Sequence, residues 1–538
     1  MEARRGDAAG AARKRAHANE SPFCNGEKEG QTLKKKVLSA IMALALCLSL
    51  LPAPAFAAAT GEDTPEPAAT DIYVRSTGND GNAGTQTAPC ATLARAVEAA
   101  ENGATIYVMS NLTMTKCARC YDKDLTITSL DPNNPVTISR GTEFAPQSDP
   151  ARSQYNPAMI EVQTNGDKPA GLTLTNIILD DAGKHEGTVF AQAVSDDGTS
   201  TSDTSRNTVY VQDAIIASNA TVPSTITLGD GAVLRNFGGM SAVRVTDQAK
   251  LVMKSGSKIE DTTVTDRVKG PSGSVGPAGA VWLQGGSFTM EAGTKIQNVN
   301  GRAVYADGGE AHIGGTISNI TGNANMWQGT NGTAIHLRNN ATGTLTATGL
   351  ITNVTGDGSN IVYLNSSTYT MDAGSIINNL ANNNLANQKT HGIYSVDSKA
   401  DLRNEVRING EICRINGNPL QIANTNVYIG ETGNIHNNFV NYGALYLQRN
   451  ATADIYGKIN NNTATGRGGG NGTAGHGFVE INLYDGAEIK DNIANKTGGG
   501  LSLKNTKFVM HGGEVSGNRS NNNVGGGVFL YDDAVAEL

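Results

Sequence analysis

The chain has 538 residues, of which 64 are glycine, a share of about 12 % against a usual share of roughly 7 %. Charged residues make up 17 % and aromatic residues 5 %; the polar share comes from Gly, Asn, Thr and Ser, which excludes a coiled coil and a charge-rich disordered protein. Residues 1–57 hold nine Lys/Arg and five Asp/Glu, so with −8 overall the remainder carries −12, and nucleic acid is not an expected partner.

The first 57 residues have the features of a Sec-type signal peptide. Three lysines precede an apolar run over residues 37–51, and an Ala-Phe-Ala site ends at Ala57, after which we predict cleavage. The 15 apolar residues fall short of the ~20 that span a bilayer, so no transmembrane segment is expected beyond the signal. The sequence predicts a secreted or cell-surface protein. Residues 1–32 make the segment before the lysines longer than the n-region of an ordinary signal peptide, so we expect the true start of the protein near Leu33.

The residues after the predicted cleavage site indicate a linker, followed by elements that would cap one end of a strand stack. Residues 58–70 include the acidic stretch TGEDTPEPAAT and are predicted to be a linker, with order from Asp71. A strand over residues 71–74, a tight loop over 78–85, a short amphipathic helix over 92–100 and a strand over 104–109 are then expected. A helix ahead of the first repeat would cover the open end of a strand stack, which otherwise exposes unpaired backbone.

From Gly239 onward the sequence repeats, and each copy begins with an alternating strand. The copies begin at Ala242, Ala280, Ala303, Ala334, Ile361, Gly392, Pro419, Ala444, Phe478, Gly500 and Gly527. Each copy has two alternating strands joined by a polar turn, a glycine-marked corner, a third strand and an Asn-rich turn. Three strands in about 25 residues cannot pair with each other, but each can pair with its counterpart in the next copy, about 4.8 Å along an axis. The repeat predicts an all-β solenoid, a parallel β-helix.

The alternation also predicts which side chains point inward. In three representative coils the inward residues are Val281, Leu283, Phe288, Met290 and Ile296; Val362, Leu364, Tyr369, Met371 and Ile377; and Leu501, Leu503, Phe508, Met510 and Val515. Asparagine recurs two residues after the third-strand isoleucine, at Asn298, Asn319, Asn353, Asn379, Asn437 and Asn461. These asparagines predict a ladder of stacked amides along one turn, where Asn also tolerates a left-handed backbone.

The N-terminal elements carry a recognisable pattern. It consists of Tyr73-Val74, Gly78-x-Asp80, Asn82-x-Gly84-Thr85, Pro89, Thr92-Leu93, Ala96, Gly103 and Ile106. This pattern resembles the opening of right-handed parallel β-helix proteins of the pectate-lyase-like superfamily, and the GGGVFL motif at residues 525–530 resembles its surface adhesin-like branch. The resemblance covers residues 71–538 and implies a right-handed parallel β-helix with a short N-terminal capping helix. It fixes no activity, because the superfamily holds lyases, hydrolases, adhesins and phage tailspikes.

Catalytic motifs of that superfamily are mostly missing. Its lyases resemble one another in using Ca²⁺-binding acidic residues with an Arg or Lys base, and its polygalacturonases in carrying Asn-Thr-Asp, Asp-Asp, Gly-His-Gly and Arg-Ile-Lys. Only Asp180-Asp181 and Gly475-His476-Gly477 occur here, on coils too distant to share a site. We therefore predict no catalytic residue, no metal and no cofactor. Ca²⁺ is expected only under the alternative of a polysaccharide lyase or glycoside hydrolase acting on uronic-acid polymers, with a site in the loops 141–158, 184–206 and 262–279.

Two charged clusters leave alternatives open. The first cluster is either a solvated turn or a site that binds a cation or supplies an acid and a base. It comprises Asp180, Asp181, Lys184, His185 and Glu186. The other cluster either faces an acidic polysaccharide or is scattered surface charge, and it comprises Arg235, Arg244, Lys250, Lys254 and Lys258.

Four cysteines remain after the predicted cleavage. Cys117 and Cys120 have metal or redox spacing, but the sequence offers no second cysteine pair or suitable histidine. In an exported protein we expect a disulfide among Cys90, Cys117 and Cys120, the alternative being that adjacent turns bury them. Cys413 lies at a repeat position and is expected to be a small apolar filler.

The outward residue of the first strand forms the most informative column. Through successive copies it is Arg244, Trp282, Tyr305, His336, Tyr363, Tyr394, Gln421, Tyr446, Glu480, Ser502 and Phe529. Stacked coils would turn these residues into a solvent-facing aromatic stripe. We expect ligand binding from Trp282, Tyr305, His336, Tyr363, Tyr394, Tyr446 and Phe529, because aromatic faces bind sugars and a coil spacing of about 4.8 Å is near a monosaccharide length. The alternative is a purely structural ladder of cross-strand aromatic pairs.

Together these features predict an exported adhesin-like protein that binds a polysaccharide or a host or cell-surface glycan along the stripe. The alternatives are the enzyme described above and an inert stalk. The last copy stops after its second strand at Leu538, so we expect a longer protein with further coils, a cap and a wall anchor.

Overall fold

The computed structural model describes residues 70–141, 144, 158–164, 167–181, 215–218, 222–239, 241–264, 279–322, 333–356, 359–379, 390–395, 404–473, 477–522 and 524–538. The predicted signal peptide and all of the predicted linker except Thr70 lie outside these residues. So do Lys184, His185, Glu186 and His476, and most of the three loops expected to form a catalytic site.

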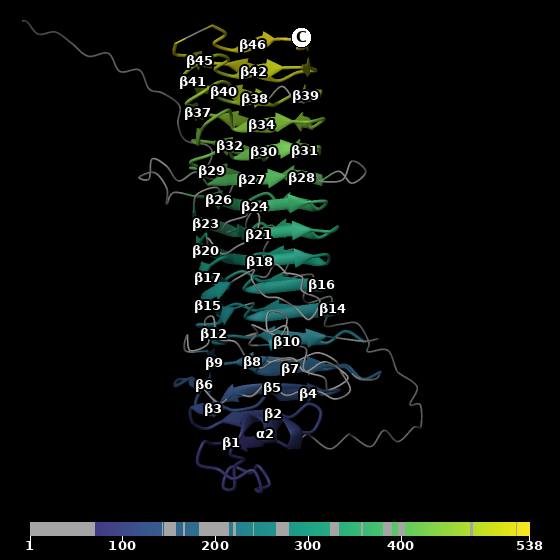
Figure 1. Cartoon of the computed structure of the whole chain (residues 1–538), viewed down its shortest axis with the longest axis vertical. Helices are drawn as coiled ribbons and strands as arrows, with labels where there is room; N and C mark the ends of the chain where they lie inside the picture. Colours follow the sequence, from purple (N-terminus) through teal and green to yellow (C-terminus); the bar gives the residue numbers. More distant parts are fainter. Residues whose placement is uncertain are drawn as a thin grey trace, which may run out of the picture. The chain divides into compact units, whose positions relative to one another are not determined.

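The described chain is a parallel β-helix whose coils stack along one axis (Figure 1). Every strand pair is parallel and joins equivalent strands of adjacent coils, as the alternating repeat predicts. In each coil a first and a second strand belong to one 28-stranded sheet, and a third strand belongs to a 15-stranded sheet. A third sheet of four short strands follows the third strand in the C-terminal coils.

The first strands of the coils are β4 (Ala118–Tyr121), β7 (Ile160–Gln163), β10 (Ile215–Ser218), β14 (Val243–Met253), β16 (Val281–Met290), β18 (Arg302–Asp307), β21 (Thr333–Arg338), β24 (Asn360–Asn365), β27 (His391–Ser395), β30 (Leu420–Ala423), β34 (Leu445–Gln448), β38 (Asn471–Thr473), β42 (Leu501–Lys504) and β46 (Val528–Tyr531). The strands β14 and β16 run on through the polar turn and supply the second strand of their coils as well.

The separate second strands are β1 (Ile72–Val74), β2 (Thr105–Val108), β5 (Asp124–Ser129), β8 (Gly171–Thr175), β11 (Thr225–Leu228), β19 (Glu310–Ile313), β22 (Thr342–Leu345), β25 (Thr368–Met371), β28 (Asn404–Ile408), β31 (Thr425–Ile429), β35 (Thr452–Ile455), β39 (Val479–Leu483), β43 (Thr506–Met510) and β47 (Val535–Glu537).

The third strands are β3 (Leu112–Met114), β6 (Val136–Arg140), β9 (Ile177–Asp180), β12 (Val233–Arg235), β15 (Lys258–Val264), β17 (Lys295–Asn300), β20 (Thr316–Thr321), β23 (Leu350–Thr355), β26 (Ile376–Asn378), β29 (Glu411–Cys413), β32 (Asn434–His436), β36 (Lys458–Asn460), β40 (Glu488–Lys490) and β44 (Glu514–Ser516), with β13 (Gly238–Gly239) beside β15. The short strands are β33 (Phe439–Val440), β37 (Thr463–Ala464), β41 (Ile493–Ala494) and β45 (Arg519–Ser520).

The core runs along the inside of the coils and consists of the predicted inward residues. All ten predicted in the coils of β16 and β24 are buried, as are Leu501, Leu503 and Phe508. Met510 and Val515, in one of the last coils, are partly buried against the same core. The inward pattern is confirmed, because a side-chain period of two places alternate residues on one face of a strand.

The predicted asparagine ladder exists in part. The Asn319 amide donates to the Asn298 carbonyl oxygen at 2.9 Å, and the Asn353 amide donates to Asn319. These asparagines have φ near +57°, a left-handed conformation that Asn tolerates. Asn379 departs from the prediction: it is buried, and its side chain bonds the backbone of Val354 through both amide atoms.

A second asparagine ladder lies inside the C-terminal coils and was not predicted. It consists of Asn438, Asn462, Asn492 and Asn518, in which each side-chain Nδ2 donates to the Oδ1 of the next at 2.8–3.0 Å. Each Nδ2 also donates to a backbone carbonyl of the preceding coil, as Asn462 does to Ile435 at 3.0 Å. The ladder therefore gives hydrogen-bond partners to third-strand carbonyls and to turn N–H groups in the interior of the coils.

The N-terminal end is closed by a helix, as predicted, and also by a loop. Helix α2 (Leu93–Ala99) buries Leu93, Ala96 and Val97 against the first coils, and Thr92 caps it by accepting from the Arg95 backbone. Residues 84–90 cover the free edge of β1: Tyr73 N–H donates to the Gly84 carbonyl at 2.7 Å, and Cys90 N–H donates to the Tyr73 carbonyl at 2.9 Å. The Asp80 carboxylate holds this loop by accepting from two backbone N–H groups and the Thr92 hydroxyl at 2.8–2.9 Å.

One repeat was aligned incorrectly. The repeat predicts a first strand at Phe478, but β39 pairs with the second strand β35. The first strand of that coil is β38, where Gly472 stands opposite Tyr446. The error arose because Val479, Ile481 and Leu483 alternate like a first strand, whereas β38 has no such alternation. The triple glycine at residues 468–470, which recurs at 498–500 and 525–527 before β42 and β46, marks the correct start.

Candidate functional site

The first-strand column has the predicted register over most of its length. Consecutive pairs join Arg244 to Trp282, then Tyr305, His336, Tyr363, Tyr394, Gln421 and Tyr446. The next positions are Gly472, Ser502 and Phe529, so Glu480 is not in the column. A Cβ at Gly472 would collide with the Tyr442 carbonyl oxygen, so this coil cannot place an aromatic residue there.

The centre of this column is not exposed to solvent, which corrects the predicted stripe. Trp282, Tyr305 and His336 have exposed fractions of 6 %, 0 % and 7 %. Tyr363, Tyr394, Tyr446 and Phe529 are half-buried. The residues point away from the coil interior as predicted, but only these last four offer surface to a large ligand.

Arginine side chains pack on the buried part of the column. The Arg244 guanidinium lies 5.3 Å from the ring centre of Trp282, and that of Arg302 lies 5.6 Å from the ring centre of Tyr305. Arg338 donates to the Tyr305 hydroxyl at 3.3 Å. Burial, aided by the positive charges of Arg302 and Arg338, holds the pKa of His336 well below its usual value. His336 is therefore a neutral member of an aromatic stack, with its ring centre 4.9 Å from Tyr305 and 4.6 Å from Tyr363.

A second aromatic column, which sequence analysis missed, follows the ends of the second strands. It consists of Tyr428, Tyr456, Tyr484 and His511, and we call it the tyrosine ladder. Successive ring centres lie 5.2, 4.3 and 4.9 Å apart, and the Tyr456 and Tyr484 rings are parallel to within 1°. The three tyrosines are half-buried, as are the outer members of the first-strand column, and His511 is exposed. The signal in the sequence is an aromatic residue directly after the last residue of β35, β39 and β43.

Polar groups flank the tyrosine ladder. The Asn482 amide donates to the Asp454 carboxylate at 3.0 Å; Asp454 is the cross-strand partner of Tyr428, and Asn482 is the cross-strand partner of Asp454. Arg407 lies 5.4 Å from the ring centre of Tyr428 and is paired with Glu405 at 2.5 Å. Desolvation raises the pKa of the Tyr484 hydroxyl, and the nearby Asp454 carboxylate raises it further. The ladder thus combines ring edges, neutral hydroxyls, an amide and a carboxylate on one strip of surface.

The Asp180–Asp181 pair is engaged in ion pairs rather than in an open site. Asp181 faces Arg140 at 3.1 Å with both side chains fully buried. Asp180 accepts from Arg235 at 2.7 Å and from the Asn236 amide at 2.8 Å. Both carboxylates form ion pairs that join neighbouring coils. Neither is therefore placed to exchange a proton with a substrate or to bind a cation.

The predicted basic patch is divided between two sheets. Arg235 and Lys258 lie on the 15-stranded sheet, whereas Arg244 and Lys250 lie on β14 of the 28-stranded sheet. Arg235 is paired with Asp180, and Arg244 packs on Trp282. This arrangement agrees with the alternative of scattered charges.

The cysteines contradict the expected disulfide. Cys90, Cys117, Cys120 and Cys413 are free and buried. Burial raises the pKa of the Cys117 and Cys120 thiols to about 12, so both are neutral core groups. Cys90, Cys117 and Cys120 are therefore small side chains buried between adjacent turns, which is the alternative to the disulfide given above.

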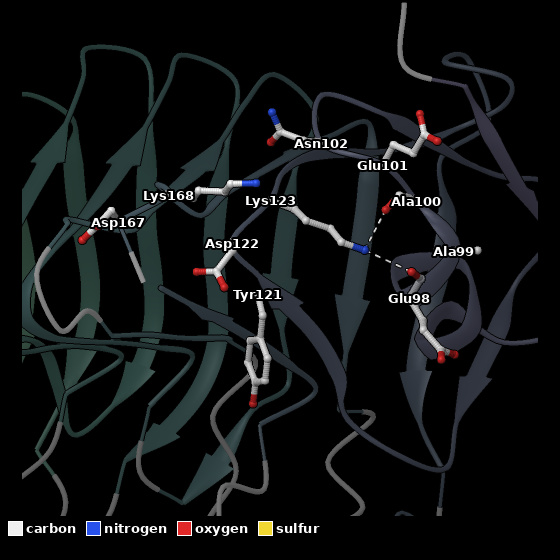
Figure 2. A pocket seen from close by; sticks show the side chains of 10 residues that line it. All are labelled: Glu98, Ala99, Ala100, Glu101, Asn102, Tyr121, Asp122, Lys123, Asp167 and Lys168. Carbon is white, nitrogen blue, oxygen red and sulfur yellow. Dashed lines mark hydrogen bonds between the residues drawn. The ribbon is translucent and has the colours of Figure 1, made fainter. Parts of the chain in front are cut away.

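An open hollow of about 850 Å³ lies between the end of α2 and the turn that joins β4 to β5 (Figure 2). Its central cation, Lys123, donates to the backbone carbonyls of Val97, Glu98 and Ala100 at 3.3, 3.0 and 2.7 Å. The ammonium therefore satisfies the C-terminal carbonyls of the capping helix, which have no partner within the helix. The hollow owes its shape to the cap, and Lys123 is a structural residue.

No protein-family model and no curated protein sequence matches the chain. Among solved structures, it is similar to a TibA fragment hyper-glycosylated by TibC, with 10 % identity, a TM-score of 0.29 and coverage of 81 % of this chain and 100 % of that one. It is also similar to the GH136 lacto-N-biosidase from Eubacterium ramulus, with 10 % identity, a TM-score of 0.29 and coverage of 87 % and 68 %. A third neighbour is XylC in complex with xylose, with 8 % identity, a TM-score of 0.24 and coverage of 82 % and 70 %.

These likenesses are distant, and the fold assignment rests on the strand pairings of the chain itself. Among the described residues, no helix is both long enough and apolar enough to cross a membrane.

Proposed function

We propose that this chain is an exported adhesin-like protein, secreted or held at the cell surface, which binds a polysaccharide or a host or cell-surface glycan. We further propose that it belongs to the adhesin-like branch of the pectate-lyase-like superfamily, as its N-terminal pattern suggests. The observation that supports binding is the tyrosine ladder, a continuous stack of aromatic rings that reaches the surface in four consecutive coils.

The geometry of the ladder favours hydrogen bonding at its rim. Because Tyr456 and Tyr484 stack in parallel at 4.3 Å, each ring covers a face of the other. The ladder therefore presents ring edges and phenol hydroxyls, beside the Asp454 carboxylate and the Asn482 amide. Hydroxyls that both donate and accept, repeated at about the 4.8 Å spacing of the coils, suit the hydroxyl groups of successive sugar units.

The first-strand column contributes less to this proposal than the sequence suggested. Its half-buried members Tyr363, Tyr394, Tyr446 and Phe529 remain in the proposed surface. Trp282, Tyr305 and His336 are left out because they are buried.

The test is binding of the full chain to pectic, alginate and glycosaminoglycan polymers by affinity electrophoresis. The double variant Tyr456→Ala/Tyr484→Ala should weaken binding at least about tenfold, which corresponds to roughly 1.4 kcal/mol. The matched control is Tyr73→Ala/Tyr107→Ala, which removes a stacked, half-exposed tyrosine pair at the N-terminal end, with ring centres 5.2 Å apart. That control should bind as the parent does.

Other outcomes would overturn the proposal. Equal losses in the two double variants would mean that the ladder has no special part in binding. Release of reducing ends from any polymer, with Ca²⁺ present, would favour the lyase or hydrolase alternative. No binding to any glycan would favour an inert stalk.

A further inference from the structure

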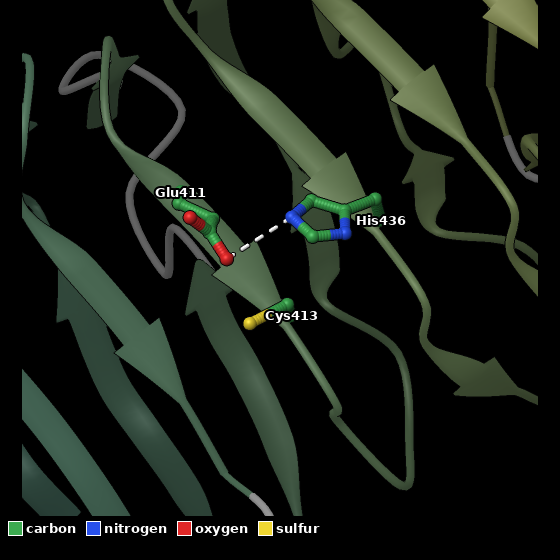
Figure 3. Close-up of side chains that lie close together, drawn as sticks. All are labelled: Glu411, Cys413 and His436. Atoms are coloured by element: carbon green, nitrogen blue, oxygen red, sulfur yellow. Dashed lines mark ion pairs between the residues drawn. The ribbon is translucent and has the colours of Figure 1, made fainter.

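Three potential metal ligands converge on the outward face of two adjacent third strands. Glu411 and Cys413 are two residues apart on β29, so they lie on the same face of the strand. His436 on β32 is the cross-strand partner of Cys413. Figure 3 shows the three side chains on the same side of the paired strands, with the Glu411 carboxylate beside the imidazole.

The distances between the three groups are close to those of a metal site. One ligand atom from each residue lies within 4.8 Å of the other two, and Glu411 Oε1 is 3.0 Å from His436 Nε2. Bond lengths of about 2.0–2.3 Å in a tetrahedral zinc site place its ligand atoms roughly 3.3–3.5 Å apart. Small rotations of the Glu411 and Cys413 side chains would reach that spacing. The Glu411 and His436 side chains are 40 % and 18 % exposed, so an ion can enter from solvent.

The neighbouring coils add two carbonyl oxygens to this surface. Asn378 is the cross-strand partner of Cys413 on one side, and Asn434 is the partner of Glu411 on the other. Within the described part of the chain, the Oδ1 atoms of Asn378 and Asn434 are buried and have no hydrogen-bond partner. Uncompensated acceptors of this kind are costly unless something donates to them or coordinates them.

The second nitrogen of the imidazole is also held. His436 Nδ1 lies 2.7 Å from the Asn437 amide. When a metal takes Nε2, the imidazole proton resides on Nδ1 and needs an acceptor, which the exposed Asn437 side chain supplies by turning its oxygen toward the ring. A hydrogen bond to the distal nitrogen is the usual way in which proteins orient a ligating histidine.

We propose that Glu411, Cys413 and His436 bind one divalent transition-metal ion of the Zn²⁺ class. A thiolate, an imidazole and a carboxylate together favour Zn²⁺ over Ca²⁺ or Mg²⁺, which prefer oxygen ligands. Binding exchanges the thiol proton of Cys413 for the ion and releases that proton to solvent. The ion would join the coil of β29 to the coil of β32 and leave a fourth position for water or a ligand. This site is independent of the proposed glycan binding.

The test uses Co²⁺ as a spectroscopic probe on the full chain after treatment with a chelator. One equivalent of Co²⁺ should give a thiolate-to-cobalt charge-transfer band and the visible bands of a four-coordinate ion. Addition of Zn²⁺ should remove both, because Zn²⁺ lies above Co²⁺ in the stability order of such sites. Cys413→Ser should abolish the charge-transfer band, and His436→Gln should weaken Co²⁺ binding at least about tenfold.

Two controls keep the result interpretable. His312→Gln alters a histidine that also faces a carboxylate, Glu310 at 3.7 Å, and should leave the Co²⁺ spectrum unchanged. The unfolding midpoint of each variant in chelator should equal that of the parent, which shows that the coils remain folded. The proposal is overturned if no charge-transfer band appears, or if the band survives Cys413→Ser.

Discussion

The N-terminal and C-terminal coils stack in the same way but carry different side-chain columns. In the N-terminal coils opposite charges meet, as Arg140 meets Asp181 at 3.1 Å and Arg235 meets Asp180 at 2.7 Å. In the C-terminal coils opposite charges also meet, as Lys458 and Glu488 do at 2.9 Å, but like residues form columns as well, namely asparagines in the internal ladder and tyrosines in the tyrosine ladder. Like charges repel at a spacing of about 4.8 Å, whereas an amide offers both a donor and an acceptor and aromatic rings attract each other. A regular repeat can therefore copy neutral residues from coil to coil, whereas the fully buried Asp181 is matched by an arginine of the neighbouring coil.

The largest expected effect comes from breaking a charged column. Asp181→Ala leaves the fully buried Arg140 guanidinium without its carboxylate, and we expect the free energy of unfolding to fall by about 3–5 kcal/mol. Urea denaturation followed by circular dichroism measures this loss. The double variant Arg140→Met/Asp181→Leu should lose much less, because neither charge of this buried pair remains. A loss below about 1 kcal/mol in the single variant would show that the pair is not buried as described.

An intermediate effect is expected in the internal asparagine ladder. Asn462→Ala removes the acceptor of the Asn438 backbone N–H at 3.1 Å and the donor to the Ile435 carbonyl at 3.0 Å. Two buried polar groups without partners should cost about 2–3 kcal/mol by the same measurement. The matched control is Asn319→Gly in the exposed ladder, which keeps the left-handed backbone and should cost less than about 1 kcal/mol. Equal losses would mean that burial does not distinguish the two ladders.

The smallest effect concerns pH and lies between the two regions, at His336. Its pKa is lowered in the folded chain by burial and by Arg302 and Arg338, so the unfolded chain binds a proton at a higher pH than the folded one. The resulting stability is present above the ordinary histidine pKa of about 6.5 and is lost as the pH falls below it. The urea midpoint should fall between pH 7 and pH 5, and His336→Phe should reduce that fall. An unchanged pH dependence in the variant would show that other groups cause it.

The sequence predicted the interior of the coils better than their outer surface. The alternation that buries Val281 and Leu283 is visible along a single strand, and stacking equivalent residues follows from it. The cover over Tyr305 cannot be predicted from one strand alone, because it needs two arginines: Arg302 lies on the same strand, but Arg338 reaches the Tyr305 hydroxyl from the next coil. Alternation shows that an aromatic side chain points outward, but it does not show whether neighbouring side chains cover it.

The candidate metal cluster shows the same limit. Cys413 was assigned as an apolar filler because its own strand offers no histidine. The imidazole of His436 comes from the next coil, and only the pairing of β29 with β32 brings it beside the thiol.

The misaligned repeat at Phe478 has another cause. The alternation of Val479, Ile481 and Leu483 outweighs the triple-glycine signal that precedes the true first strand, β38.

The loop over residues 84–90 has a consequence for how such a molecule can grow. Parallel stacking has no intrinsic stop, since each coil offers the next one a complete row of backbone groups. By occupying the outer edge of β1, this loop prevents a second chain from adding there and extending into a fibre. It also leaves the other coils free to vary in number, so duplication or loss of a whole repeat changes the length of the solenoid without disturbing its sealed end.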